Sequence, residues 1–199
     1  MRFHKLISTL LHPIVIPTIV VILYFLLIKN NLSHDHKVTV LSLVFVASYL
    51  IPLLSLIILK KIRFIKNFQT ESIKERKLPI ALMTIVFYFL GNSLITIPNL
   101  RDLGFLFYTT SLGLFLIYIL YNFKIKASVH LLSFGICIGF FMVLSRYYAQ
   151  SFTITIIVTI LLSGLLASAR LNLKKHTSRE IYIGFFIGVF SSFSLNYFL

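Results

Sequence analysis

Long apolar stretches dominate this chain and restrict it to a membrane fold. Seven of them, each about 18–23 residues long, could cross a hydrocarbon core of about 30 Å as helices. Hydrophobic residues make up 58% of the 199 residues, and the mean hydropathy of +0.96 far exceeds that of ordinary soluble domains. We therefore expect an all-α fold, a polytopic membrane helix bundle with about seven transmembrane helices in a single domain over residues 1–199. The expected spans are Ile7–Ile28, Val38–Leu59, Pro79–Ile97, Leu103–Tyr121, Ala127–Tyr147, Phe152–Ala169 and Ile181–Phe198.

The net charge of +14 follows the alternation of spans and loops. Basic residues lie in short loops at span ends, which is typical of membrane topology and argues against nucleic-acid binding. With seven spans, the N-terminus and the loops after spans two, four and six share one side. The other side carries Lys29, Lys37, Arg101 and Arg146, and the crowded side, which includes Lys66, carries the remaining 15 of the 19 basic residues. The positive-inside rule predicts that the crowded side is cytoplasmic, in a protein of the cell inner membrane.

A polar hinge, Arg170–Glu180, separates the sixth and seventh spans and holds an unusual set of side chains. Arg170, His176 and Glu180 follow the spacing R-x5-H-x3-E. A carboxylate four residues after a histidine can share its helical face and orient the imidazole. An arginine upstream presents a fork suited to phosphate. The pattern predicts a lipid-phosphate site at the membrane boundary.

Two further polar segments open spans on the same side, because an even number of spans separates them from the hinge. Lys74 and Arg76 precede Pro79, which we expect to begin the third span. The segment Lys126-Ala127-Ser128-Val129-His130 opens the fifth span. All three segments can therefore contribute to one site.

Glycine pairs follow both histidines of these segments. Gly135-x3-Gly139 in the fifth span and Gly184-x3-Gly188 in the seventh are small-x3-small patterns, which let helices approach closely in lipid. If these two faces pack together, His130 and His176 meet at the same membrane boundary. Helix packing alone would also account for the glycines.

At this order and spacing the chain resembles the type-2 phosphatidic acid phosphatase family, which shares its fold with vanadium haloperoxidases. That family shows a K-x6-R-P segment, then P-S-G-H, then S-R-x5-H-x3-D. Ser128-Val129-His130 matches the second motif with alanine for proline and valine for glycine, and only Arg76 followed by Pro79 corresponds to the first. Arg170, His176 and Glu180 match the third in full spacing, with Ala169 for serine and glutamate for aspartate. The resemblance covers about residues 74–188 and implies a six-helix core plus one helix.

The resemblance implies a metal-independent lipid phosphatase without a cofactor. His176 would attack phosphorus and form a phosphohistidine, oriented by Glu180, and His130 would protonate the departing alcohol and later activate water. The phosphate oxygens would be held by Arg170, Arg76 and Ser128, with Lys126 and Lys74 as further cations inferred from proximity in sequence. The implied substrate is a lipid phosphomonoester or a polyprenyl diphosphate, bound among membrane lipids. Many members of the family work on the outer leaflet, so this implication and the charge count leave both faces open.

Each residue also has a purely structural interpretation. Thr177 and Glu180 fit a capping box, Ser128 fits an N-cap, and Arg170 fits an interfacial anchor. The departures from the family motifs also allow a non-catalytic relative that binds lipid headgroups or supports other membrane proteins. A transporter is the least favoured class, because the spans lack an acidic residue of the kind that ion-coupled carriers use. Oligomeric state cannot be predicted from the sequence.

Overall fold

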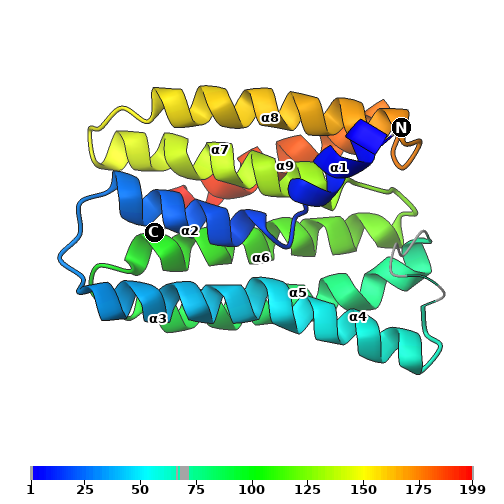
Figure 1. The fold of residues 1–199 in the computed structure, drawn as a ribbon, viewed down its shortest axis with the longest axis horizontal. Helices are drawn as coiled ribbons and strands as arrows, with labels where there is room; N and C mark the ends of the chain where they lie inside the picture. The colour runs from blue at the N-terminus through cyan, green and yellow to red at the C-terminus, as the bar shows by residue number, and fades with distance from the viewer. Residues whose placement is uncertain (1, 66, 68–71, 199) are drawn as a thin grey trace.

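A computed structural model describes the backbone of residues 2–65, 67 and 72–198 and the side chains up to residue 195 within those ranges. Every regular element in this part of the chain is a helix (Figure 1). Lys66, counted above among the basic residues, lies outside the described residues. The elements are α1 (Arg2–Leu10), α2 (Ile16–Leu27), α3 (His34–Phe45), the π-helix η1 (Val46–Leu50), α4 (Ile51–Lys61), α5 (Ile73–Ile95), α6 (Arg101–Asn122), α7 (Val129–Tyr147), α8 (Thr153–Asn172) and α9 (Ser178–Phe198).

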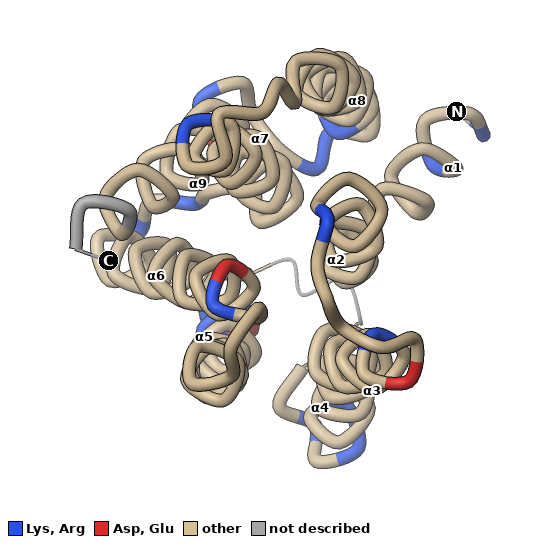
Figure 2. Tube along the Cα trace, turned by 90° about the vertical axis from the view of Figure 1, so that its left-hand side faces the viewer, with Lys and Arg blue, Asp and Glu red and all other residues tan. Residues whose placement is uncertain are grey.

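The long helices give the chain the form of a helical integral membrane protein. Five are long and apolar enough to cross a membrane: the continuous helix His34–Lys61, α5, α6, α7 and α8. They run side by side along the long axis of the molecule (Figures 1 and 2). Large apolar side chains cover the outside of the bundle, among them Phe89, Ile154, Leu161, Phe186 and Phe190, all exposed. Such a surface suits lipid and would be a liability in water.

The expected first span, Ile7–Ile28, is wrong as a single helix. The chain forms α1 up to Leu10, turns over residues 11–15, and begins α2 at Ile16. Pro13 has no backbone N–H and disfavours helical geometry at the residue before it, so the helix ends there. Pro17 lies in the first turn of α2, where a proline is tolerated. The 12-residue α2 is shorter than a full span.

Two other prolines lie inside helices. The prediction that Pro79 begins a helix is wrong, because α5 begins at Ile73, where Ser72 and Glu75 form a capping box. Pro52 follows η1, in which the Ile51 N–H bonds to the Val46 carbonyl. This wider turn gives the proline ring room next to the preceding turn of helix.

Helices α7 and α9 pack against each other through the glycines, which meets the condition under which the two histidines come together. A Cβ added at Gly135 would overlap the Phe185 carbonyl, and one at Gly184 would overlap the Ser128 carbonyl. The backbone N–H of Ser128 also donates to the Glu180 carbonyl at 3.0 Å. The beginnings of the fifth and seventh predicted spans are therefore fixed side by side.

A half-buried acid, Asp102, ties helices together at the opposite end of the bundle. Asp102, in the first turn of α6, accepts hydrogen bonds from the Tyr24 hydroxyl at 3.0 Å and the Tyr148 hydroxyl at 2.5 Å. These contacts join α2, α6 and the end of α7. The predicted site lies at the other end of the bundle.

Candidate functional site

A cavity of about 710 Å³ opens between the helix ends that carry the three polar segments. Its polar walls include cations and histidines, and no carboxylate of a described residue lines it. The charged and polar lining residues are Lys5, Ser8, Thr9, His12, Ser55, Arg76, Lys126, His130, Arg170, Lys174, Lys175 and His176. A cavity with this lining attracts anions and gives no ligand set for a hard cation.

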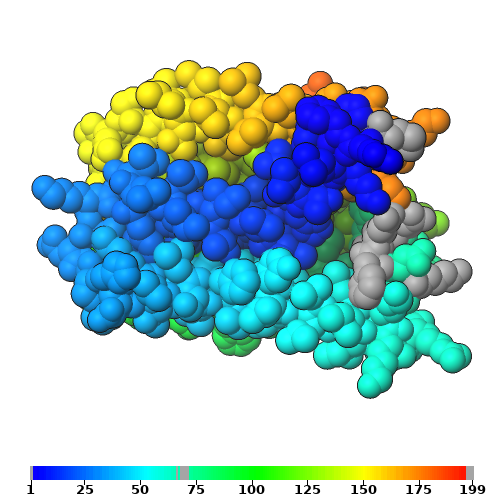
Figure 3. All heavy atoms as spheres, viewed as in Figure 1, coloured from blue at the N-terminus to red at the C-terminus, as the bar shows by residue number. Residues whose placement is uncertain are grey.

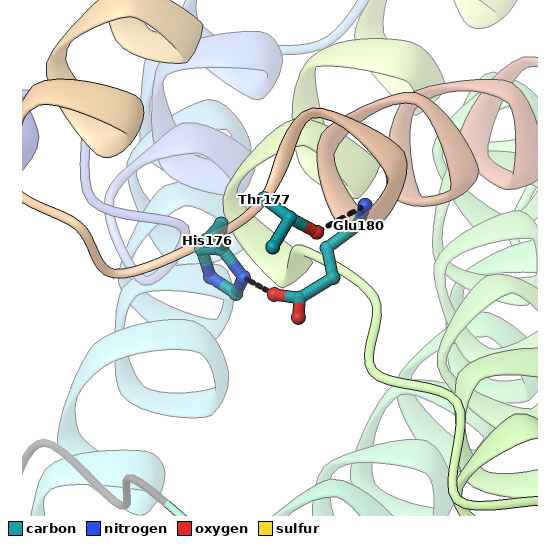
Figure 4. Close-up of polar contacts among 3 residues, drawn as sticks. All are labelled: His176, Thr177 and Glu180. Carbon is teal, nitrogen blue, oxygen red and sulfur yellow. Dashed lines mark hydrogen bonds and ion pairs between the residues drawn. The ribbon is translucent and has the colours of Figure 1, made fainter.

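His176 lines this cavity, and its ring is paired with Glu180, which lies outside the lining (Figure 4). The Nδ1 atom of His176 lies 2.6 Å from Oε2 of Glu180, and the His176 side chain is only 1% exposed. The prediction that both lie on one helical face is wrong in detail. Thr177 caps α9 by accepting from the Glu180 N–H at 3.4 Å, so the helix begins after His176. The pair forms across this helix start.

The short hydrogen bond assigns the ring's tautomer. A carboxylate accepts, so Nδ1 of His176 carries the proton and donates it to Glu180, and Nε2 keeps its lone pair in the neutral ring. Burial lowers the pKa of His176 below its ordinary value of 6.5, the bond to Glu180 opposes this effect, and the charges of Arg170 and Arg76 add to it. The imidazole is therefore neutral at pH 7 and nucleophilic at Nε2.

We expect Glu180→Gln to move the titration of His176 to lower pH. The carboxylate stabilises the imidazolium, so its removal leaves burial and two arginines, all of which disfavour protonation. Nuclear magnetic resonance of histidine-labelled protein in micelles would measure the midpoint. Arg179→Gln, which changes an exposed side chain in the same turn, serves as the control. A midpoint above 6.5 in the wild type, or one that rises in Glu180→Gln, would contradict this assignment.

His130 lies on the first turn of α7 and lines the same cavity as His176. Its Nε2 atom is buried and has no hydrogen-bond partner among the described residues. A buried polar atom of this kind carries a desolvation cost that a ligand could remove. The two histidines therefore share one cavity, as the glycine packing predicts.

Arg170 belongs to the last turn of α8, so the hinge is shorter than predicted and spans residues 173–177. The Nη1 atom of Arg170 donates to the Ser8 hydroxyl at 3.0 Å. The Nε atom of Arg170 is buried without a partner among the described residues. Arg76, on the second turn of α5, lines the cavity with it. Two guanidinium groups from separate helices therefore face one volume.

The remaining predicted residues differ in their positions. Lys126 lines the cavity, whereas Lys74 is exposed on the first turn of α5 and is not among the lining residues. Ser128 occupies the N-cap position of α7 but makes no side-chain cap bond, and its buried hydroxyl has no partner among the described residues. It is not part of the cavity lining. The phosphate-binding roles of Lys74 and Ser128 stay predictions.

The N-terminal segment contributes residues that the sequence analysis missed. Lys5, Ser8 and His12 line the cavity, and α1 packs against α8. A continuous first span would have carried His12 into the lipid, away from the site. Pro13 was the available signal, because a helix that ends before it keeps His12 near the boundary.

A smaller, apolar cavity of about 140 Å³ adjoins the polar one. It continues into the bundle between α2, α5, α6 and α7, and Cys137 and Leu114 line its inner part. Residues shared by both linings are Pro13, Pro52, Pro79, Ile80, Met83 and Val129. A cationic chamber therefore meets an apolar chamber at a ring of prolines and aliphatic side chains.

No protein-family model, curated protein or solved structure matches this chain. What the site can do chemically depends on the cavity's own residues. These are an oriented neutral imidazole, a second buried imidazole and two guanidinium groups around a volume that suits an anion.

Proposed function

We infer that this protein is a membrane-embedded phosphohydrolase of the type-2 phosphatidic acid phosphatase kind, acting on lipid phosphates without a metal. The observation that carries the inference is that His176, paired with Glu180 at 2.6 Å, lines one cavity together with His130, Arg76 and Arg170. An imidazole oriented by a carboxylate, beside cations and a second imidazole, fits nucleophilic attack on phosphorus.

The proposed reaction has two steps. Nε2 of His176 forms a bond to phosphorus while the bond from phosphorus to the bridging oxygen breaks. The electron pair moves to that oxygen, which takes a proton from His130 and leaves as the alcohol. Neutral His130 then removes a proton from water, and the hydroxide displaces His176 and releases phosphate. Glu180 stabilises the positive charge on the His176 ring, and Arg76 and Arg170 neutralise the phosphoryl oxygens.

The adjoining apolar cavity supports a lipid substrate over a soluble phosphate. A phosphate in the polar cavity would have its ester carbon beside Val129 and Pro13, which line both volumes. A hydrocarbon chain can continue from there into the apolar cavity or into the membrane. Burial of its methylenes contributes about 0.8 kcal/mol each. A lipid phosphomonoester or a polyprenyl diphosphate meets these requirements.

For the membrane arrangement we propose about seven transmembrane segments in the cell inner membrane. Two segments add to the five long helices: the N-terminal segment with α2, and α9, which runs beside α7. The excess of lysine and arginine at the end of the bundle that carries the site favours a cytoplasmic face for it.

A non-catalytic lipid-binding role is the second candidate. Ala127, Val129 and Ala169 replace residues of the family motifs, and Arg76 with Pro79 is all that remains of the first motif. Such a protein would bind lipid phosphates and release no phosphate from them.

The decisive experiment measures both binding and turnover. Purified protein in vesicles would be given phosphatidic acid, a polyprenyl phosphate and a polyprenyl diphosphate, with protein-free vesicles as the control. We expect phosphate release from at least one of them, at the turnover numbers of about 1–10³ per second typical of enzymes. Binding without release would favour the second candidate, and an absence of both would contradict the two together.

A further inference from the structure

His12 is a third histidine of the polar cavity, and it lies outside the segment that resembles the phosphatase motifs. Its ring contacts that of His130 edge to face, with centroids 5.0 Å apart and planes at 77°. It comes from the turn between α1 and α2, so a different part of the chain brings it to the site. In Figure 3 the N-terminal segment, in dark blue, lies against the C-terminal part of α8 at this end of the molecule.

The two nitrogens of the His12 ring have different surroundings. Nδ1 accepts a hydrogen bond from the Ile14 N–H at 3.4 Å. In the neutral ring the proton is therefore on Nε2. Among the described residues, the His12 ring is hydrogen-bonded to Ile14 and to no other. Its Nε2–H is therefore free to donate to a ligand in the cavity.

The position of His12 is tied to the boundary between the two cavities. His12 precedes Pro13 and His130 follows Val129, and both Pro13 and Val129 line the polar and the apolar cavity. A substrate with its phosphate in one cavity and its chain in the other must carry its bridging oxygen past this boundary. Two imidazoles therefore flank the place where negative charge develops as the phosphorus–oxygen bond breaks.

We propose that His12 is a further catalytic residue, whose Nε2–H donates a hydrogen bond to the bridging oxygen of the substrate beside His130. The inference rests on the proposed phosphohydrolase function. His12 keeps its proton throughout and stabilises the electron pair that the bridging oxygen gains, while His130 transfers the proton that makes the alcohol. A donor preorganised at a developing charge is typically worth about 10²–10³-fold in rate.

Two isosteric substitutions separate this role from a structural one. In His12→Asn the amide oxygen can replace Nδ1 and keep the bond to Ile14, but nothing reaches the position of Nε2. In His12→Gln an amide N–H₂ reaches the Nε2 position, and the Ile14 bond is lost. A catalytic role predicts that kcat falls about 10²-fold in His12→Asn, and by less than about tenfold in His12→Gln. A purely structural role predicts the reverse order.

The leaving group supplies the closing test. A long-chain alkyl phosphate needs stabilisation of its bridging oxygen, whereas a nitrophenyl phosphate with an alkyl chain of the same length stabilises that oxygen itself. We expect the loss in His12→Asn to shrink by at least about tenfold on the nitrophenyl substrate. His34→Ala, an exposed histidine at the far end of the bundle, should leave both rates unchanged.

The outcomes separate the two proposals. Equal losses on both substrates, or greater activity in His12→Asn than in His12→Gln, would overturn the role of His12 and leave the phosphohydrolase standing. A wild-type protein that hydrolyses neither substrate would overturn the function, and the role of His12 with it.

Discussion

His176→Ala is expected to abolish phosphate release, with a loss of roughly 10⁴–10⁶-fold in kcat, because it removes the atom that we propose bonds to phosphorus. The His176 side chain is 1% exposed and its hydrogen bond is to Glu180. Since it lies between α8 and α9 and not within a helix, the substitution leaves the helices their own backbone bonds. The loss should appear in kcat while the lipid phosphate still binds to Arg76 and Arg170.

Two companion measurements make this result specific. A lipid substrate labelled with radioactive phosphorus should leave acid-labile label on the quenched wild-type protein and none on His176→Ala. Glu180→Gln keeps the size of the side chain and loses its charge, and we expect an intermediate loss of about 10²–10⁴-fold. Arg179→Gln, one residue away and exposed, should retain full activity. Label that persists in His176→Ala would show that another residue is the nucleophile.

Much of the fold follows from the sequence because lipid leaves the chain few choices. A long apolar stretch in a membrane must be a helix, since its backbone groups find no water. Counting such stretches assigns the polar segments to one end, and that agrees with Arg76, His130 and His176 lining one cavity. Close packing of α7 on α9 was also predictable, because glycine pairs at four-residue spacing have few other uses in a membrane.

The errors occur where local chemistry competes with hydrophobicity. The apolar run Ile7–Ile28 hides a break at Pro13, and that break is what gives the site His12 and Ser8. Helix α5 begins before Pro79 because the capping box of Ser72 and Glu75 satisfies backbone N–H groups at an earlier helix start. Pairing across elements, such as Arg170 with Ser8 over 162 residues, has no periodic signal in the sequence.

Gly184→Ala is expected to reduce both stability and activity, because it pushes apart α7, which carries His130, and α9, which begins just after His176. The added Cβ would overlap the Ser128 carbonyl oxygen, and it would lie 3.0 Å from both the carbonyl carbon and the nitrogen of Ser128. These are backbone atoms, so no side chain can rotate away and α7 must move relative to α9. Overpacking of this kind costs about 1–3 kcal/mol.

The same displacement acts on the site. Ser128 immediately precedes the helix that carries His130, and its N–H is bonded to the Glu180 carbonyl behind His176. A shift of about 1 Å between groups that must act together can cost about 10²-fold in rate. We therefore expect a lower midpoint of thermal unfolding in detergent and a kcat reduced by about that factor.

Gly164→Ala on α8 is the matched control, since a Cβ there would meet nothing within 4 Å. It makes the same chemical change in another helix of the bundle, and it should leave both the unfolding midpoint and kcat near their wild-type values. If Gly184→Ala behaved like Gly164→Ala, the contact between α7 and α9 would not hold the two imidazoles in position. The catalytic geometry would then have to depend on the N-terminal segment and α8, through the bond from Arg170 to Ser8.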